Sequence, residues 1–198
     1  MAQTDEVLTF WFANPQTGLA NFDQWRKAWF VKDLTFDQHV RDRFLTIYER
    51  AAVGELDHWQ ESPAGCLALV LVLDQFPRNM FRRDPRAFAT DFKAVEITRR
   101  AIAKKIHQAL KPLQKLFLYL PLEHSENLDH QNQCVALFQE LIADHPGFGK
   151  EFEDTYSYAA RHQDVIKQFG RFPHRNEVLG RETTPAEAEF LKQPGSSF

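Results

Sequence analysis

Apolar residues recur every three or four positions along most of this chain, and the alternating pattern of strands is hard to find. The pattern therefore predicts an all-α protein. The expected helices cover residues 5–12, 35–53, 63–76, 85–105, 112–120, 125–144, 149–169 and 185–192. Between the first two lies a looser, aromatic-rich segment, residues 14–34, from which we expect a short helix docked on the core. The last six residues are expected to fray.

Helix-start signals precede several of these segments. They are a capping box at Thr35 and Gln38, Ser62 before Pro63, Asp84 before Pro85, and Thr184 and Pro185 followed by Glu187. Stop signals are equally clear, because proline cannot donate the backbone hydrogen bond that continues a helix. Pro77 and Pro121 are expected to end two helices, and Gly54 and Gly170 to follow the ends of two others. The apolar stripe of the 85–105 helix is predicted to be Phe88, Phe92, Val95, Ile102 and Ile106.

Length and composition fit one soluble domain, residues 1–198, with 18 Phe and four Trp to fill a core between helices. The net charge of −3 offers no basic field for a phosphate backbone, so nucleic acid is not an expected partner. Cys66 and Cys134 do not form a CxxC pair, which argues against a disulfide or zinc framework. The acidic N-terminus and the absence of a long apolar run indicate a cytoplasmic protein without a membrane partner.

Three polar motifs carry most of the side chains that could do chemistry. Two of them read almost alike: Asp74-Gln75-Phe76-Pro77-Arg78-Asn79 and Gly170-Arg171-Phe172-Pro173-His174-Arg175-Asn176. The third, Pro121-Leu122-Glu123-His124-Ser125-Glu126, lies between them. The three motifs follow alternate helices in the predicted series, and short connections favour antiparallel neighbours. We therefore expect all three motifs to lie at one pole of the fold.

Two kinds of chemistry are compatible with these motifs. In the first, Arg78, Arg171 and Arg175 hold a carboxylate or phosphate, while Asn79 and Asn176 fix its orientation. This describes a binding module for a small anion or a peptide carboxylate.

In the second, His124 or His174 transfers a proton, as in a hydrolase or lyase of a small carboxylate or phosphate ester. Glu123 and Glu126 are expected to hold His124 in one tautomer, so that Glu123 counts among the catalytic residues. Asp74 is expected to orient an arginine, and His162 adds a further titratable group.

A purely structural interpretation explains much of the same pattern, because Arg and His near helix ends bond to exposed carbonyls and neutralise the helix dipole. Binding of a protein partner elsewhere on the helices also stays an alternative. We predict no metal and no cofactor: Glu55 and His58 form one Glu-x-x-His motif, but a di-iron bundle needs two. Glu126 and His130 share a helix face, a spacing that surface helices commonly show without function.

The three motifs, together with Gly54-Glu55-Leu56-Asp57-His58-Trp59, resemble the bacterial family known as domain of unknown function 924. The resemblance spans nearly the whole chain, about residues 5–192. It implies a tetratricopeptide-like right-handed superhelix of antiparallel helix pairs, and it implies no reaction or substrate. The chain itself lacks a clear 34-residue repeat. It departs from the family pattern at Arg83, where glycine is expected, and at Asn127, where aspartate is expected.

Overall fold

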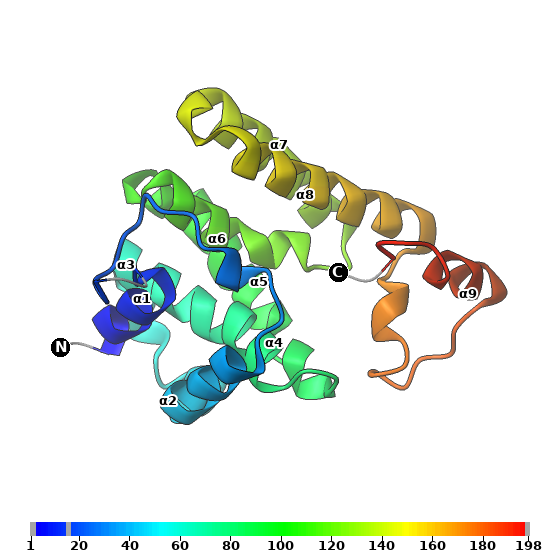
Figure 1. The fold of residues 1–198 in the computed structure, drawn as a ribbon, viewed down its shortest axis with the longest axis horizontal. Helices are drawn as coiled ribbons and strands as arrows, with labels where there is room; N and C mark the ends of the chain where they lie inside the picture. Colours follow the sequence, from blue (N-terminus) through cyan, green and yellow to red (C-terminus); the bar gives the residue numbers. More distant parts are fainter. Residues whose placement is uncertain (1–2, 15–16, 197–198) are drawn as a thin grey trace. The chain divides into compact units, whose positions relative to one another are not determined.

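The computed structural model describes residues 3–14 and 17–196. Its regular structure is helical, and the only pairing of strand type within these residues is an isolated bridge between Ala13 and Ala20. The all-α prediction is therefore confirmed. The chain divides into two compact units, which are described separately (Figure 1). Unit 1 comprises residues up to 82 and residues 86–121, and unit 2 comprises residues 83–85 and 122–198. The single domain and the superhelix stay predictions.

Unit 1 is built from α-helices and short 3-10 turns. Its α-helices are α1 (Gln3–Phe12), α2 (Leu34–Ala52), α3 (Pro63–Val70), α4 (Phe76–Met80), α5 (Asp91–Ala103) and α6 (Pro112–Glu123), whose last two residues belong to unit 2. The 3-10 turns are η1 (Lys27–Trp29), η2 (Asp57–Glu61), η4 (Pro85–Phe88, at the unit boundary) and η5 (Ile106–Ala109). Among the described residues of the aromatic segment that precede α2, only η1 is helical, and Phe30 next to it is 53% exposed.

The centre of unit 1 is a continuous helical segment, residues 63–80, in which α3 and α4 are joined by a π-helical turn, η3 (Leu71–Gln75). Every residue from Gly65 to Pro77 is buried, so this part of the segment is surrounded by the core on all sides. Packed against it are the rings of Phe10, Trp11 and Phe44, each within 6.3 Å of Phe76. The expected aromatic core is thus present.

Pro77 does not end this helix, contrary to the prediction. The π-helical turn carries the chain past it, since the Phe76 N–H donates to Leu71, five residues back. Pro77 cannot donate to the carbonyl of Leu73, four residues before it. The buried hydroxyl of Thr90 donates to that oxygen instead, at 2.6 Å. A side chain distant in sequence therefore supplies the hydrogen bond that proline lacks.

Pro121 fails as a stop signal in the same way, because α6 continues to Glu123. The buried hydroxyl of Thr98 donates at 2.9 Å to the carbonyl oxygen of Leu118, three residues before the proline. Two helical prolines in unit 1 are thus each accompanied by a buried threonine on a nearby carbonyl.

Two further predictions in unit 1 are wrong in detail. Helix α2 is capped by Asp33, whose carboxylate accepts from the N–H groups of Thr35 and Phe36, and not by a capping box at Thr35. The expected 85–105 helix begins only at Asp91, because residues 85–88 form the 3-10 turn η4. Its buried face therefore shifts, and Phe92, placed in the apolar stripe, is 80% exposed. Its buried residues are Ala94, Val95, Ile97, Thr98 and Ala101.

Unit 2 consists of α7 (Leu128–Asp144), α8 (Gly149–Phe169) and α9 (Pro185–Leu191), with 3-10 turns η6 (Pro146–Phe148) and η7 (Pro173–Arg175). Helices α7 and α8 lie side by side (Figure 1). The predicted capping box at Thr184 and Glu187 is present at the start of α9. Gly170 follows α8 with φ of 69°, the left-handed conformation that glycine tolerates. These local signals are confirmed.

The structure shows what each of the two departures from the family pattern does locally. Asn127 caps α7, because its side-chain oxygen accepts from the N–H groups of Asp129 and His130. Aspartate would accept the same bonds, so this departure conserves the cap. Arg83 lies in the turn after α4 with φ of 60°. Glycine adopts that conformation without strain, and arginine does not.

We expect Arg83→Gly to stabilise the protein. Relief of a left-handed backbone is worth about 1–2 kcal/mol, and the greater freedom of glycine in the unfolded chain offsets about 0.5–1 kcal/mol of it. Chemical denaturation should therefore show a gain of roughly 0.5–1 kcal/mol. Arg83→Ala is the matched control, because it removes the side chain and keeps the Cβ. An equal gain from alanine would contradict the explanation.

Candidate functional site

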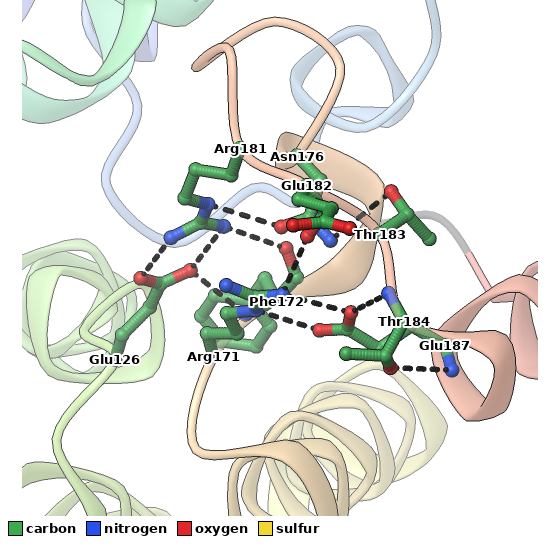
Figure 2. Close-up of polar contacts among 9 residues, drawn as sticks. All are labelled: Glu126, Arg171, Phe172, Asn176, Arg181, Glu182, Thr183, Thr184 and Glu187. Atoms are coloured by element: carbon green, nitrogen blue, oxygen red, sulfur yellow. Dashed lines mark hydrogen bonds and ion pairs between the residues drawn. The ribbon is translucent and has the colours of Figure 1, made fainter.

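The second and third motifs meet within unit 2. The carboxylate of Glu126, just after the end of α6, accepts a hydrogen bond from the backbone N–H of Phe172 at 2.7 Å (Figure 2). Phe172 follows Gly170, which turns the chain after α8. This part of the predicted convergence is therefore observed inside one unit. The first motif, Asp74 to Asn79, belongs to unit 1, and its meeting with the other two stays a prediction.

Arg181, a residue outside every motif, ties the two together (Figure 2). Its guanidinium donates to both carboxylate oxygens of Glu126, at 2.7 and 3.0 Å, and to the carbonyl oxygen of Phe172, at 3.0 Å. Its Nε donates to the side-chain oxygen of Asn176 at 3.0 Å. Burial alone would raise the pKa of Glu126, but the bonds from Arg181 and from the Phe172 N–H bring it below its usual value. Glu126 and Asn176 are thus parts of an internal network.

Arg171 is held in a second ion pair of the same region (Figure 2). Its Nε and one Nη donate to the two carboxylate oxygens of Glu187, at 2.6 and 2.8 Å, and the same Nη donates to the carbonyl of Glu182. Arg171 lowers the pKa of Glu187 to about 2. Because Glu187 also completes the capping box of α9, Arg171 anchors that helix to the end of α8.

The ring of Phe172 is the centre of a group of basic side chains. The guanidinium carbon of Arg175 lies 4.4 Å from the ring centroid, and the rings of His174 and His162 lie 5.6 and 5.4 Å away. Phe172, Arg175 and His162 are buried, whereas His174 is half-buried. The third motif adds His124, also half-buried, whose charge acts on His162 together with those of Arg175 and His174. We call His124, His162, His174 and Arg175 the basic cluster.

His162 is neutral in this setting. Burial lowers its pKa to about 3, and the nearby charges of His124, Arg175 and His174 act in the same direction, against a hydrogen bond to a backbone carbonyl. That bond joins Nδ1 to the carbonyl oxygen of Tyr158 at 2.8 Å. A carbonyl oxygen only accepts, so Nδ1 carries the proton and Nε2 the lone pair.

A buried carboxylate and a buried amide lie beside the cluster. Glu123 is 5% exposed, and its Oε1 lies 3.4 Å from Nδ1 of His162. Gln131, fully buried on α7, donates from Nε2 to the carbonyl oxygens of Glu123 and Ser125, at 2.6 and 2.7 Å, and so fixes the end of α6. Burial raises the pKa of the Cys134 thiol, with the charge of Glu123 adding to the effect, so this cysteine is not a thiolate at neutral pH.

The first motif lies in unit 1 and forms ion pairs there. Arg78 donates to both carboxylate oxygens of Asp91, each at 2.9 Å, and lies 3.3 Å from the fully buried carboxylate of Asp74. Asn79 donates at 2.7 Å to Asp37 of α2, which also pairs with Arg82. These contacts join the centre of unit 1 to α5 and to α2.

The sequence identified the motif residues but missed most of their partners. The missed residues are Asp37, Asp91, Gln131 and Arg181, together with Glu187 in its role as the partner of Arg171. Only Glu187 carried a local signal, as the capping-box glutamate. The other four act across turns or between helices, and no spacing pattern marks them.

Within the described parts of the chain, no group of three or more His, Cys, Asp and Glu side chains is placed to hold a metal ion. His130 bonds instead to the Ser125 hydroxyl at 2.8 Å, and Glu55 pairs with Arg50. No helix of the described residues has the length and apolar character needed to cross a bilayer.

Comparison with known proteins places this geometry in a family. No curated protein matches the chain. Among solved structures, the chain is similar to a protein of unknown function, ATU0120, from Agrobacterium tumefaciens, with 37% sequence identity and a TM-score of 0.79, covering 96% of this chain and 97% of the other. The model of the family described as bacterial protein of unknown function (DUF924) matches residues 7–195. The chain therefore belongs to the DUF924 family of bacterial proteins of unknown function.

Proposed function

We propose that this protein binds a small anion, a carboxylate or a phosphate, at the basic cluster of unit 2. The observation that carries the proposal is the gathering of basic side chains about one ring, with Arg175 and His174 at 4.4 and 5.6 Å from the centroid of Phe172. Arg175 supplies a permanent charge, and the half-buried His174 and His124 connect the cluster to solvent. In this proposal His124, His174 and Arg175 contact the ligand.

The remaining motif residues are bonded to other groups of the protein, so we do not assign them to ligand binding. Arg78 and Arg171 each hold a carboxylate through two hydrogen bonds, so their geometry favours a structural role over anion binding. Glu126 and Asn176 are joined by Arg181, and Asn79 is joined to Asp37. We propose that Asp74, Asn79, Glu126 and Asn176 position the loops, and that Glu123 compensates the positive charge of the cluster.

The acid/base alternative needs a histidine that titrates near neutral pH. His162 does not meet this need, because burial lowers its pKa to about 3. An enzyme built on this site would have to use His124 or His174.

Thermal unfolding in the presence of sodium phosphate or sodium citrate, against sodium chloride at equal ionic strength, tests the proposal. A ligand at ten times its dissociation constant stabilises the folded state by about 1.4 kcal/mol, which raises the Tm of a chain of this size by roughly 2–5 °C. We expect His174→Gln to lose most of this rise. His58→Gln, which alters an exposed histidine of unit 1, should keep it. Equal rises in all three proteins would refute the assignment.

A further inference from the structure

A second group of polar atoms lies within the aromatic core of unit 1, and its polar side chains belong to none of the three motifs. Arg26 is half-buried, and its Nη1 donates to the carbonyl oxygens of Phe10 and Trp11, at 3.2 and 2.5 Å. The indole N–H of Trp29 donates to the same Trp11 carbonyl at 2.9 Å. These bonds hold one side of the Arg26 guanidinium against the end of α1.

The other edge of that guanidinium makes no hydrogen bond to the described residues. The Nε of Arg26 is buried and has no hydrogen-bond partner among the described residues. Nη2 also makes no hydrogen bond to them, and none of their carboxylates forms an ion pair with Arg26. Burial lowers the pKa of Arg26, as expected of a cation without a counter-ion. The Nε and Nη2 donors of arginine are parallel, and together they match the two oxygens of a carboxylate.

A second buried donor without a partner belongs to the same cluster. The indole nitrogen of Trp11 is buried and makes no hydrogen bond within the described residues, although the side chain is only 1% exposed. The ring of Trp29 links the two groups, since its centroid lies 6.4 Å from that of Trp11 and 5.9 Å from the guanidinium carbon of Arg26. Phe117 and Phe76 approach Trp11 to 5.5 and 5.7 Å. Unpartnered buried donors are uncommon, and each one calls for a ligand, a water or an ion.

We propose that unit 1 contains a second binding site, in which the Nε–Nη2 edge of Arg26 and the indole N–H of Trp11 hold a small monocarboxylate with an apolar or aromatic body. The one positive charge of the Arg26 guanidinium is matched by a ligand with one negative charge. The parallel donors select a planar carboxylate over a spherical anion. The surrounding rings favour an apolar body, because a polar one would lose its hydration there without compensation. This site is independent of the basic cluster in unit 2.

The indole N–H resonances of the ¹⁵N-labelled protein test this proposal, with sodium benzoate as the probe and sodium acetate and sodium chloride as references at equal ionic strength. Trp11→Phe assigns the Trp11 signal by its disappearance. We expect benzoate to shift that signal saturably, and more tightly than acetate does. Arg26→Lys, which keeps the charge and loses the parallel donors, should weaken benzoate binding about tenfold.

Arg41→Lys is the matched control, because Arg41 also donates to a backbone carbonyl, that of Met80, and lies over a ring, that of Phe81. It should bind benzoate as the parent does. Should Arg26→Lys fail to fold, Trp11→Phe keeps an aromatic side chain and removes the indole N–H donor together with the five-membered ring, and benzoate binding followed on the ligand signals should weaken several-fold. A Trp11 signal that does not move, an equal saturable response to chloride, or unchanged binding in Trp11→Phe would each overturn the proposal.

Discussion

Arg78→Met is expected to destabilise unit 1 severely. The substitution keeps an apolar side chain of similar length and removes the cation that Asp74 and Asp91 share. Asp74 is fully buried and Asp91 is mostly buried, so solvent cannot replace the lost charge. Removal of one partner from a buried ion pair costs about 3–5 kcal/mol. Urea unfolding of the purified variant should show a loss of at least about 3 kcal/mol relative to the parent.

Arg43→Met is the control for this prediction. Arg43 pairs with Glu6 at 3.0 Å, but both side chains are at least 40% exposed. An exposed pair contributes about 0–1 kcal/mol, so this variant should remain close to the parent. Comparable losses in the two variants would show that burial does not set the energy of these pairs. If the free energy of unfolding of Arg78→Met were nearly equal to that of the parent, the structural role of Arg78 would be contradicted. The anion-binding role predicted from the sequence would then be favoured.

Acid should destabilise unit 2 through the buried His162. Its folded-state pKa of about 3 lies below the unfolded value of about 6.5, so the unfolded chain binds the proton more tightly. The contribution of neutral His162 is therefore complete above pH 6.5 and is lost as the pH falls towards 3. Between pH 6.5 and 4.5 the loss amounts to about 2 kcal/mol, and at pH 3 to about 4 kcal/mol.

His162→Gln tests this dependence, because glutamine can donate to the Tyr158 carbonyl and does not titrate. Denaturant unfolding at several pH values should show a flatter profile for the variant between pH 6.5 and 4.5. Below that window the carboxylates contribute to both proteins: Arg171 and Arg181 lower the pKa values of Glu187 and Glu126, so their ion pairs are lost as those groups protonate. Parallel profiles down to pH 4.5 would exclude His162 as the source.

Local signals in the sequence predicted the fold class and several helix ends correctly. Ser62 and Thr184 cap their helices as expected, because a cap depends only on residues within one turn. Pro77 and Pro121 were misjudged for a nonlocal reason. The hydroxyls of Thr90 and Thr98 reach the carbonyls near these prolines from segments 17 and 20 residues away from those carbonyls. No rule based on neighbouring residues contains that information.

The candidate site, like the fold, was predictable only where local sequence signals mark it. The motifs contain many of the residues that contact one another in unit 2, because runs of Arg, His and Glu stand out after helices. They could not show that Arg171 and Arg78 are already bound to carboxylates, since Glu187 lies 16 residues from Arg171 and Asp91 lies 13 from Arg78. Arg26 lay in the segment predicted only as a loose aromatic region. That its Nε has no hydrogen-bond partner among the described residues depends on the folded arrangement of unit 1, which no local pattern encodes.

Titration of the ¹⁵N-labelled histidine rings with sodium phosphate and sodium citrate tests anion binding at the basic cluster directly. We expect the signals of His124 and His174 to shift saturably at a common dissociation constant. His39 and His58, which lie in unit 1, should respond only as they do to sodium chloride of equal ionic strength. Shifts of His124 and His174 no larger than those of His39 and His58 would contradict an anion site at the basic cluster.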